Sequence, residues 1–156
     1  MAMTMSGEVE LEASREAVWV KLNDPAVLKA CIAGCEELEK TDDGGFRAVT
    51  KVKIGPVSAR FRGRVMLSDL DPPNGYRISG EGEGGVAGFA RGGATVRLCT
   101  RDTGTVLFYN VEAQVGGKLA QVGQRLINGA AKKLADEFFA NFARTVQACE
   151  MASTPA

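Results

Sequence analysis

The sequence between Glu36 and Val115 alternates apolar and polar residues with the two-residue period of a β-strand, and this alternation limits the fold more than any other feature. In the segment VSARFRGRVML, which runs from Val57 to Leu67, apolar or small residues occupy every second position, and mostly arginine fills the positions between. Such alternation is typical of an antiparallel strand with one face in the core and the other in water. The turn signals TDDGGF and PPNGY separate neighbouring runs, so we expect about six antiparallel strands in this region.

The period changes after Gly116 and Gly117, a glycine pair that interrupts the last strand pattern. From Lys118 onward, apolar residues recur at three- and four-residue steps, which is the spacing of an amphipathic helix. The pattern therefore predicts one long helix that begins at Lys118 and reaches Cys149.

Shorter elements precede the strand region. Alternation between apolar residues and glutamates predicts a first strand over Gly7–Ala13. Ser14 is a favourable N-cap for a short helix, and Asp24 followed by Pro25 is a favourable start for a second one. The sequence thus places two short helices directly after the first strand.

Together these patterns predict an α+β fold, in which a curved antiparallel sheet of about seven strands wraps round the long C-terminal helix. Residues 1–150 are expected to form a single domain, since the chain has 156 residues and no linker-like segment. Residues 151–156, with the sequence MASTPA, are expected to form a disordered tail.

The composition excludes several classes of function. The chain contains no histidine, which removes His-based zinc sites and every Ser-His or Cys-His nucleophile. The 19 basic and 19 acidic residues cancel, so no overall positive charge recruits nucleic acid. The start MAMTMSGEVE lacks the basic and apolar regions of a signal peptide, and we therefore predict a cytoplasmic protein with reduced thiols. No catalytic residue and no metal site is predicted.

The stretch CIAGCEELEK, from Cys31 to Lys40, carries two cysteines four residues apart. Two thiols alone do not make a tetrahedral zinc site, and no histidine exists to complete one. We expect Cys31 to pack as a small apolar side chain at the end of the second helix, with a turn at Gly34 leading into the next strand.

The predicted inner face of the sheet is rich in glycine and alanine, where a close-packed core would carry leucine or isoleucine. Such a face could leave a cavity between the sheet and the helix, or the glycines could only permit curvature while the helix fills the space. The residue pattern favours neither interpretation. The residues that would line such a cavity are Phe61, Val65, Ile78, Gly82, Ala94, Val96, Tyr109, Val111, Leu126, Ala130, Leu134 and Phe138.

Three segments resemble a known family, the CoxG family of proteins associated with carbon monoxide dehydrogenase. These are LKACIAGCEELE, the opening GEVELEASREAVWVKLNDPAVLKACI, and VGGKLAQVGQRLINGAAKKLADEFFANF, and the resemblance covers about residues 5–146. Ala33 stands where the family usually has proline. The resemblance implies the helix-grip fold of the SRPBCC, or START-like, superfamily, with an apolar cavity between the bent sheet and the C-terminal helix.

The same resemblance implies a function. Family members accompany molybdenum-containing carbon monoxide dehydrogenases and related hydroxylases, either as membrane tethers or as quinone carriers. We therefore predict a non-enzymatic binding protein for an apolar small molecule of the lipid or quinone class, with no cofactor besides such a ligand. The expected partner is a molybdenum hydroxylase of this type, and contact with the inner face of the membrane is the alternative to a purely cytoplasmic location.

Two other functions compete with this prediction. One is an enzyme, such as the polyketide cyclases or hydrolases of the same superfamily, which would have to work without histidine. The other is an assembly or membrane-recruitment factor that binds no ligand. A pair of ionisable groups inside the cavity would favour the enzyme, and a cavity filled by native side chains would favour the assembly factor.

Overall fold

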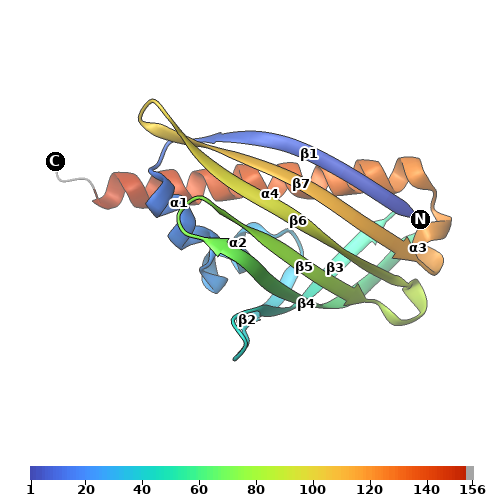
Figure 1. Ribbon diagram of the computed structural model, residues 1–156. Coiled ribbons are helices and arrows are strands. Elements are labelled where there is room, and N and C mark those ends of the chain that lie inside the picture. Colours follow the sequence, from blue (N-terminus) through green and yellow to red (C-terminus); the bar gives the residue numbers. More distant parts are fainter. Residues whose placement is uncertain (154–156) are drawn as a thin grey trace.

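The computed structural model describes residues 1–153 of the chain, and their side chains as far as residue 147 (Figure 1). The elements are, in chain order, β1 (Ala2–Leu11), α1 (Arg15–Leu22), α2 (Pro25–Cys31), β2 (Cys35–Lys40), β3 (Phe46–Ile54), β4 (Val57–Asp71), β5 (Gly75–Glu83), the 3₁₀ turn η1 (Gly85–Ala87), β6 (Phe89–Arg101), β7 (Gly104–Gly116), α3 (Lys118–Gln121) and α4 (Gln124–Ser153).

All seven strands form one antiparallel sheet in the order β1-β7-β6-β5-β4-β3-β2. The strands from β2 to β7 each pair with the next along the chain, whereas β1 pairs with β7 at the far end of the sequence. Figure 1 shows α4 running along one face of the curved sheet, with α1 and α2 near one end of it. This arrangement confirms the α+β fold predicted from the sequence.

The two short helices begin where their capping residues predict. The Ser14 hydroxyl accepts a hydrogen bond of 3.2 Å from the Ala17 amide, and the Asp24 carboxylate accepts one of 2.9 Å from the Ala26 amide. Pro25 is the first residue of α2, a position whose amide needs no helical partner. Both predictions for the helix starts are therefore confirmed.

Several predicted bounds are wrong. β1 begins at Ala2 and ends at Leu11, because β7 is long enough to pair with it from Thr105 to Gln114. The predicted helix from Lys118 is divided in two, since Gly123 has a φ of +98°, which a helix cannot contain. α4 continues past Cys149 to Ser153; of the tail expected at 151–156, the last three residues lie outside the described part of the chain.

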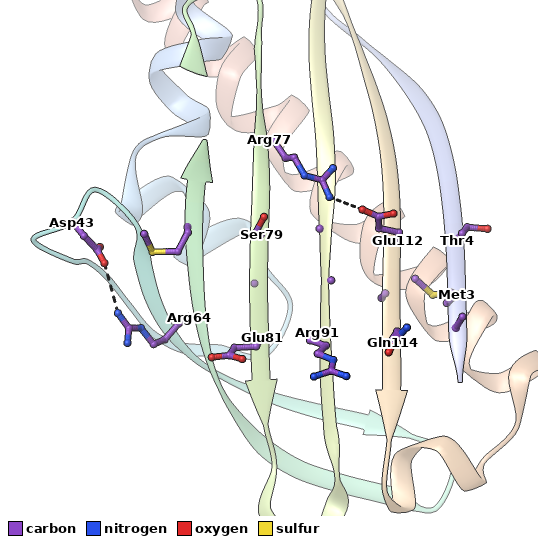
Figure 2. Close-up of a pocket in the computed structure, with 16 residues that line it drawn as sticks. Met3, Thr4, Asp43, Arg64, Arg77, Ser79, Glu81, Arg91, Glu112 and Gln114 are labelled. Atoms are coloured by element: carbon purple, nitrogen blue, oxygen red, sulfur yellow. Dashed lines mark hydrogen bonds and ion pairs between the residues drawn. The ribbon is translucent and has the colours of Figure 1, made fainter. Parts of the chain in front are cut away.

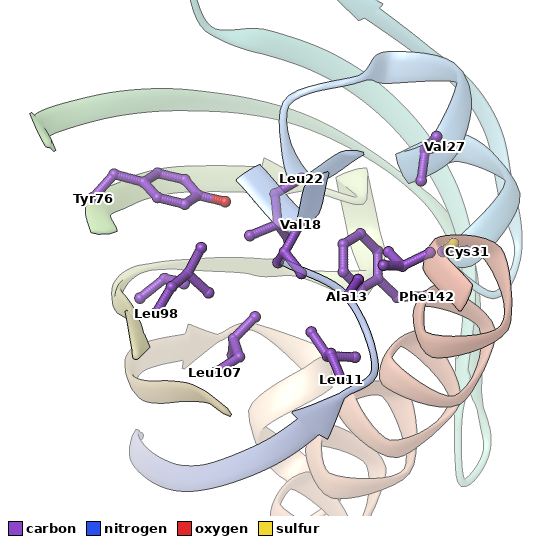
Figure 3. Packing of buried hydrophobic residues seen from close by; sticks show 12 residues of the cluster. Leu11, Ala13, Val18, Leu22, Val27, Cys31, Tyr76, Leu98, Leu107 and Phe142 are labelled. Carbon is purple, nitrogen blue, oxygen red and sulfur yellow. The ribbon is translucent and has the colours of Figure 1, made fainter. Parts of the chain in front are cut away.

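The core consists of two separate clusters at the two ends of the grip. The first, here called the α1–α2 cluster, is drawn in Figure 3. Its buried members are Leu11, Ala13, Val18, Leu22, Val27, Cys31, Tyr76, Val96, Leu98, Leu107, Phe142 and Val146. The second, here called the α3 cluster, contains Met3, Val115, Leu119 and Ile127. The C-terminal half of α4 thus packs on the first cluster and its N-terminal end on the second.

Cys31 packs as predicted. Its side chain is buried in the α1–α2 cluster, with the sulfur 3.8 Å from the Thr145 hydroxyl of α4. The Asn141 side-chain amide of α4 donates a hydrogen bond of 3.1 Å to the Cys31 carbonyl, so α4 also holds the end of α2. Cys35 is a half-buried free thiol at the start of β2, and no cluster of potential metal ligands occurs among the residues that the structure describes.

Candidate ligand-binding site

The inner face of the sheet, which faces α4, carries no charge between the two ends of strands β3 to β7. Strand alternation turns the charged residues outward, and Arg60, Glu81 and Glu112 are exposed on the opposite face. The inward positions between the ends of the sheet are apolar, glycine, threonine or tyrosine. Burying an ion here would need a partner that this face lacks, so the face suits only uncharged groups.

Half of the residues predicted to line a cavity pack against the core clusters. Val96 belongs to the α1–α2 cluster, and Ile78, Tyr109 and Phe138 pack against it. Phe61 and Val111 pack against the α3 cluster. These six side chains therefore contribute mainly to the two ends of the core.

The other six predicted residues belong to neither cluster and are here called the central residues. Leu126 and Leu134 of α4 are 47% and 39% exposed, although they are large apolar side chains. The remaining four are only half-buried: Val65, Gly82, Ala94 and Ala130. Native side chains thus leave the apolar surface between the two clusters incompletely covered.

Small residues line the middle of the sheet opposite one another. Gly63 of β4 pairs with Gly82 of β5, and Gly80 pairs with Gly92 of β6. Next to them, Ala94 lies between Ile78, which packs on one cluster, and Val111, which packs on the other. The absence of large side chains at these positions explains why the two clusters do not merge into one core.

Tyr109 is placed differently from what its role as a ligand anchor requires. Its ring stacks on Phe139 of α4 with centroids 5.0 Å apart. Its hydroxyl lies directly over Gly7 of the edge strand β1, where an added Cβ would come within 2.5 Å of the oxygen. The side chain therefore leans toward the edge of the sheet, away from the central residues on β4 to β6.

Tyr76, by contrast, was not singled out by the sequence patterns. It is 6% exposed, at the start of β5, and its ring meets Trp19 of α1 edge-on at 5.2 Å. Burial raises the pKa of its phenol to about 12. The alternation of Tyr76 with Ile78, Gly80 and Gly82 does place it on the inner face, and this signal could have identified it.

A hollow of about 1070 Å³ lies on the outer face of the sheet, and a smaller one of about 490 Å³ adjoins it (Figure 2). Both lie over β1, β5 and β7, with charged and polar side chains at their borders. Among the predicted cavity residues only Val111 borders either hollow. Sequence reasoning missed these hollows, because their form depends on contacts across several strands.

One such contact spans the larger hollow. The Arg77 guanidinium of β5 reaches across β6 to Glu112 of β7 at 2.5 Å and also donates to the Thr95 hydroxyl at 3.2 Å. It passes over Gly93, where an added Cβ would lie 2.8 Å from the guanidinium nitrogen. Figure 2 shows this pair, and the second pair Arg64–Asp43 at 3.6 Å on the opposite border. The outer hollow is thus largely neutralised by its own ion pairs.

In the part of the chain that the structure describes, no helix combines the length and the apolar character needed to cross a membrane.

Comparison with known structures supports the fold. A conserved protein from Geobacillus kaustophilus is 32% identical, with a TM-score of 0.86, and the match covers 93% of this chain and 95% of that one. The Zhui aromatase/cyclase from Streptomyces sp. R1128 is 12% identical with a TM-score of 0.68, covering 94% of both chains. Norcoclaurine synthase from Thalictrum flavum is 16% identical with a TM-score of 0.63, covering 94% and 95%. The last two show a shared helix-grip fold alone.

Sequence comparison then identifies the family. None of the curated proteins compared with the chain matches it significantly. The family model for CoxG, named as a component of carbon monoxide dehydrogenase, matches residues 7–147, which is nearly the whole chain. This match and the helix-grip fold agree with the resemblance seen in the sequence motifs, and the chain belongs to the carbon monoxide dehydrogenase CoxG family.

Proposed function

We propose that the protein binds an uncharged, apolar small molecule of the lipid or quinone class between the inner face of the sheet and α4. The central residues would contact the ligand, with Val65, Gly82 and Ala94 on the sheet and Leu126, Ala130 and Leu134 on the helix. The core clusters at both ends would hold the sheet and α4 apart and so keep the site open.

The observation that carries this proposal is the exposure of large apolar side chains on the inner side of the grip. Leu126 and Leu134 remain 47% and 39% exposed on the helix that covers the sheet. Covering such side chains with an apolar ligand would contribute about 25 cal/mol for each Å² removed from water. An uncharged inner face adds specificity, because a charged ligand would lose its hydration there without gaining a partner.

The family membership suggests the biological setting of this binding. The name of the family points to carbon monoxide dehydrogenase systems, and we propose a molybdenum-containing enzyme of this kind as the partner. The proposed location is the cytoplasm, with access to the inner face of the membrane, from which an apolar ligand would be drawn.

An enzymatic role, known from cyclases and synthases of the same fold, is the main competing function. Acid–base chemistry on a bound ligand would need ionisable groups beside it. Between the ends of β3 to β7, only Tyr76 and Tyr109 are ionisable among the inward side chains, and the pKa of Tyr76 is raised far above neutrality. The geometry therefore favours binding over catalysis.

Native mass spectrometry of the purified protein, followed by solvent extraction, would test the proposal. We expect one apolar molecule per chain, released by extraction and able to rebind. A variant with Ala130→Trp, which fills the space beside the central residues, should be purified without it. A protein that carries no extractable ligand and takes up neither added quinones nor lipids would contradict the proposal.

A further inference from the structure

The hydroxyl of Tyr76 is a polar group inside an otherwise apolar cluster. Figure 3 shows the ring projecting from β5 with its oxygen directed toward the side chains of α1, among them Val18 and Leu22. The residue is 94% buried, as its 6% exposure implies. Among residues 1–147, no side chain or backbone group forms a hydrogen bond with this hydroxyl.

This hydroxyl is nevertheless not sealed off. Within the described part of the chain, no side-chain oxygen or nitrogen is both inaccessible and without a hydrogen-bond partner. The Tyr76 oxygen must therefore touch a space that a water-sized molecule can enter. A phenol that is buried, has no protein partner and borders such a space is well placed to bind a ligand atom.

The protonation state of the phenol decides which ligand atom it would bind. With a pKa of about 12, the group remains neutral at any physiological pH and offers an O–H donor. The neighbouring inner face carries no charge that would accompany an anionic ligand. The natural partner is therefore a neutral acceptor, such as a carbonyl oxygen.

The position of the ring is also fixed. Trp19 packs edge-on against it at 5.2 Å, and Val96 of β6 lies directly opposite Tyr76 in the sheet register. A donor held in place by its neighbours loses little conformational entropy when it forms a hydrogen bond, which makes it effective in setting ligand orientation.

From these observations we infer that Tyr76 is the specificity-determining residue of the site: its hydroxyl donates a hydrogen bond to a neutral carbonyl oxygen of the ligand at the α1–α2 end of the grip. The inference rests on the proposed function, because it assigns an orientation to the ligand held by the central residues. The carbonyl would lie near α1, and the apolar remainder would extend along α4 toward Leu134 and Leu126.

Two probes of equal shape separate the hydrogen bond from the burial. 2-Acetylnaphthalene carries a carbonyl, whereas 2-ethylnaphthalene carries a methylene group at the same position. Equilibrium dialysis gives the dissociation constant of each probe for the wild-type protein and for Tyr76→Phe. Tyr109→Phe is the matched control, since it removes the other inner-face phenol, which lies over Gly7 at the sheet edge.

We expect Tyr76→Phe to weaken binding of the ketone by about 3- to 10-fold, as loss of one hydrogen bond implies. Binding of the hydrocarbon should change less than about 2-fold, and this also shows that the variant is folded. Tyr109→Phe should leave the ratio of the two constants unchanged.

The remaining outcomes are distinct. If both probes bind and their ratio is the same in the wild type and Tyr76→Phe, the assignment of Tyr76 is overturned while the ligand site stands. If neither probe binds the wild type, the proposed ligand site is overturned, and the assignment with it.

A second measurement does not depend on any variant. The infrared carbonyl stretch of 2-acetylnaphthalene bound to the wild type should lie below that of the same ketone in hexane, because the hydrogen bond weakens the C=O bond. A bound ketone with a hexane-like frequency would overturn the assignment even if Tyr76→Phe failed to fold.

Discussion

Ala94 lies at the seam between the two core clusters, and enlarging it measures whether native side chains fill the space there. Ala94→Leu adds three carbon atoms, each contributing about 0.8 kcal/mol when fully buried. At a half-buried position, about half of this gain is realised, and ordering the leucine side chain costs about 0.5–1 kcal/mol. The free energy of unfolding should therefore stay the same or rise by up to about 1 kcal/mol.

Val96, two residues further along the same face, supplies the matched control. It is 6% exposed and belongs to the α1–α2 cluster, so it has no free space beside it. Val96→Phe should overpack the cluster and lower the free energy of unfolding by about 1–3 kcal/mol. The opposite signs of two enlargements on one strand would show that only the region around Ala94 is open.

Urea denaturation of both variants and the wild type gives these differences directly, provided that the slope m is unchanged. The same Ala94→Leu protein should bind 2-ethylnaphthalene about tenfold more weakly, because leucine occupies the space of the probe and three lost methylene contacts suffice for that change. If Ala94→Leu instead loses more than about 1 kcal/mol, as Val96→Phe does, the seam is filled in the native protein and the reasoning about an open site is refuted.

Other changes test the fold around the site. Phe142→Ala should lower the free energy of unfolding by about 3–5 kcal/mol in urea titrations, since Phe142 is fully buried; a loss below about 1 kcal/mol would contradict the packing. Gly34→Ala should destabilise more than Gly44→Ala in thermal melts, because both have positive φ but only Gly34 would place a Cβ 2.3 Å from the Lys51 carbonyl oxygen; equal effects would argue against this contact. The neutral phenol of Tyr76 is favoured in the folded state, so its contribution is complete below pH 10 and declines as pH rises toward 12, by about 2.7 kcal/mol for two pKa units. Urea titrations between pH 9 and 12 should show this decline in the wild type and less of it in Tyr76→Phe; identical curves would exclude a buried phenol.

The order of elements and the faces of the strands could be predicted from the sequence, because both depend on local periodicity. Alternation assigned Val65, Ala94 and Val96 to one face, and the capping residues fixed the starts of α1 and α2. The break before α4 was missed, since a glycine such as Gly123 is compatible with a helix until its φ is known.

The candidate site was predicted less completely, because its lining depends on contacts between distant segments. Periodicity cannot show that Tyr109 leans over Gly7, a residue of the strand that pairs with it from the other end of the chain. It also cannot show that Val96 packs into the core while Ala94, on the same face, does not. The ion pair between Arg77 and Glu112 is invisible in the sequence for the same reason, since it crosses a whole strand.

The pairing of β1 with β7 has a consequence for how the chain folds. The strands from β2 to β7 can pair in sequence as a meander, but β1 must wait for β7, and the α1–α2 cluster joins Leu11 and Val18 to Phe142 and Val146. Contacts between such distant segments slow folding, because a long loop must close before they form. During synthesis the apolar inner face therefore stays uncovered until α4 has left the ribosome, and the nascent chain is most exposed to aggregation just before its last helix is complete.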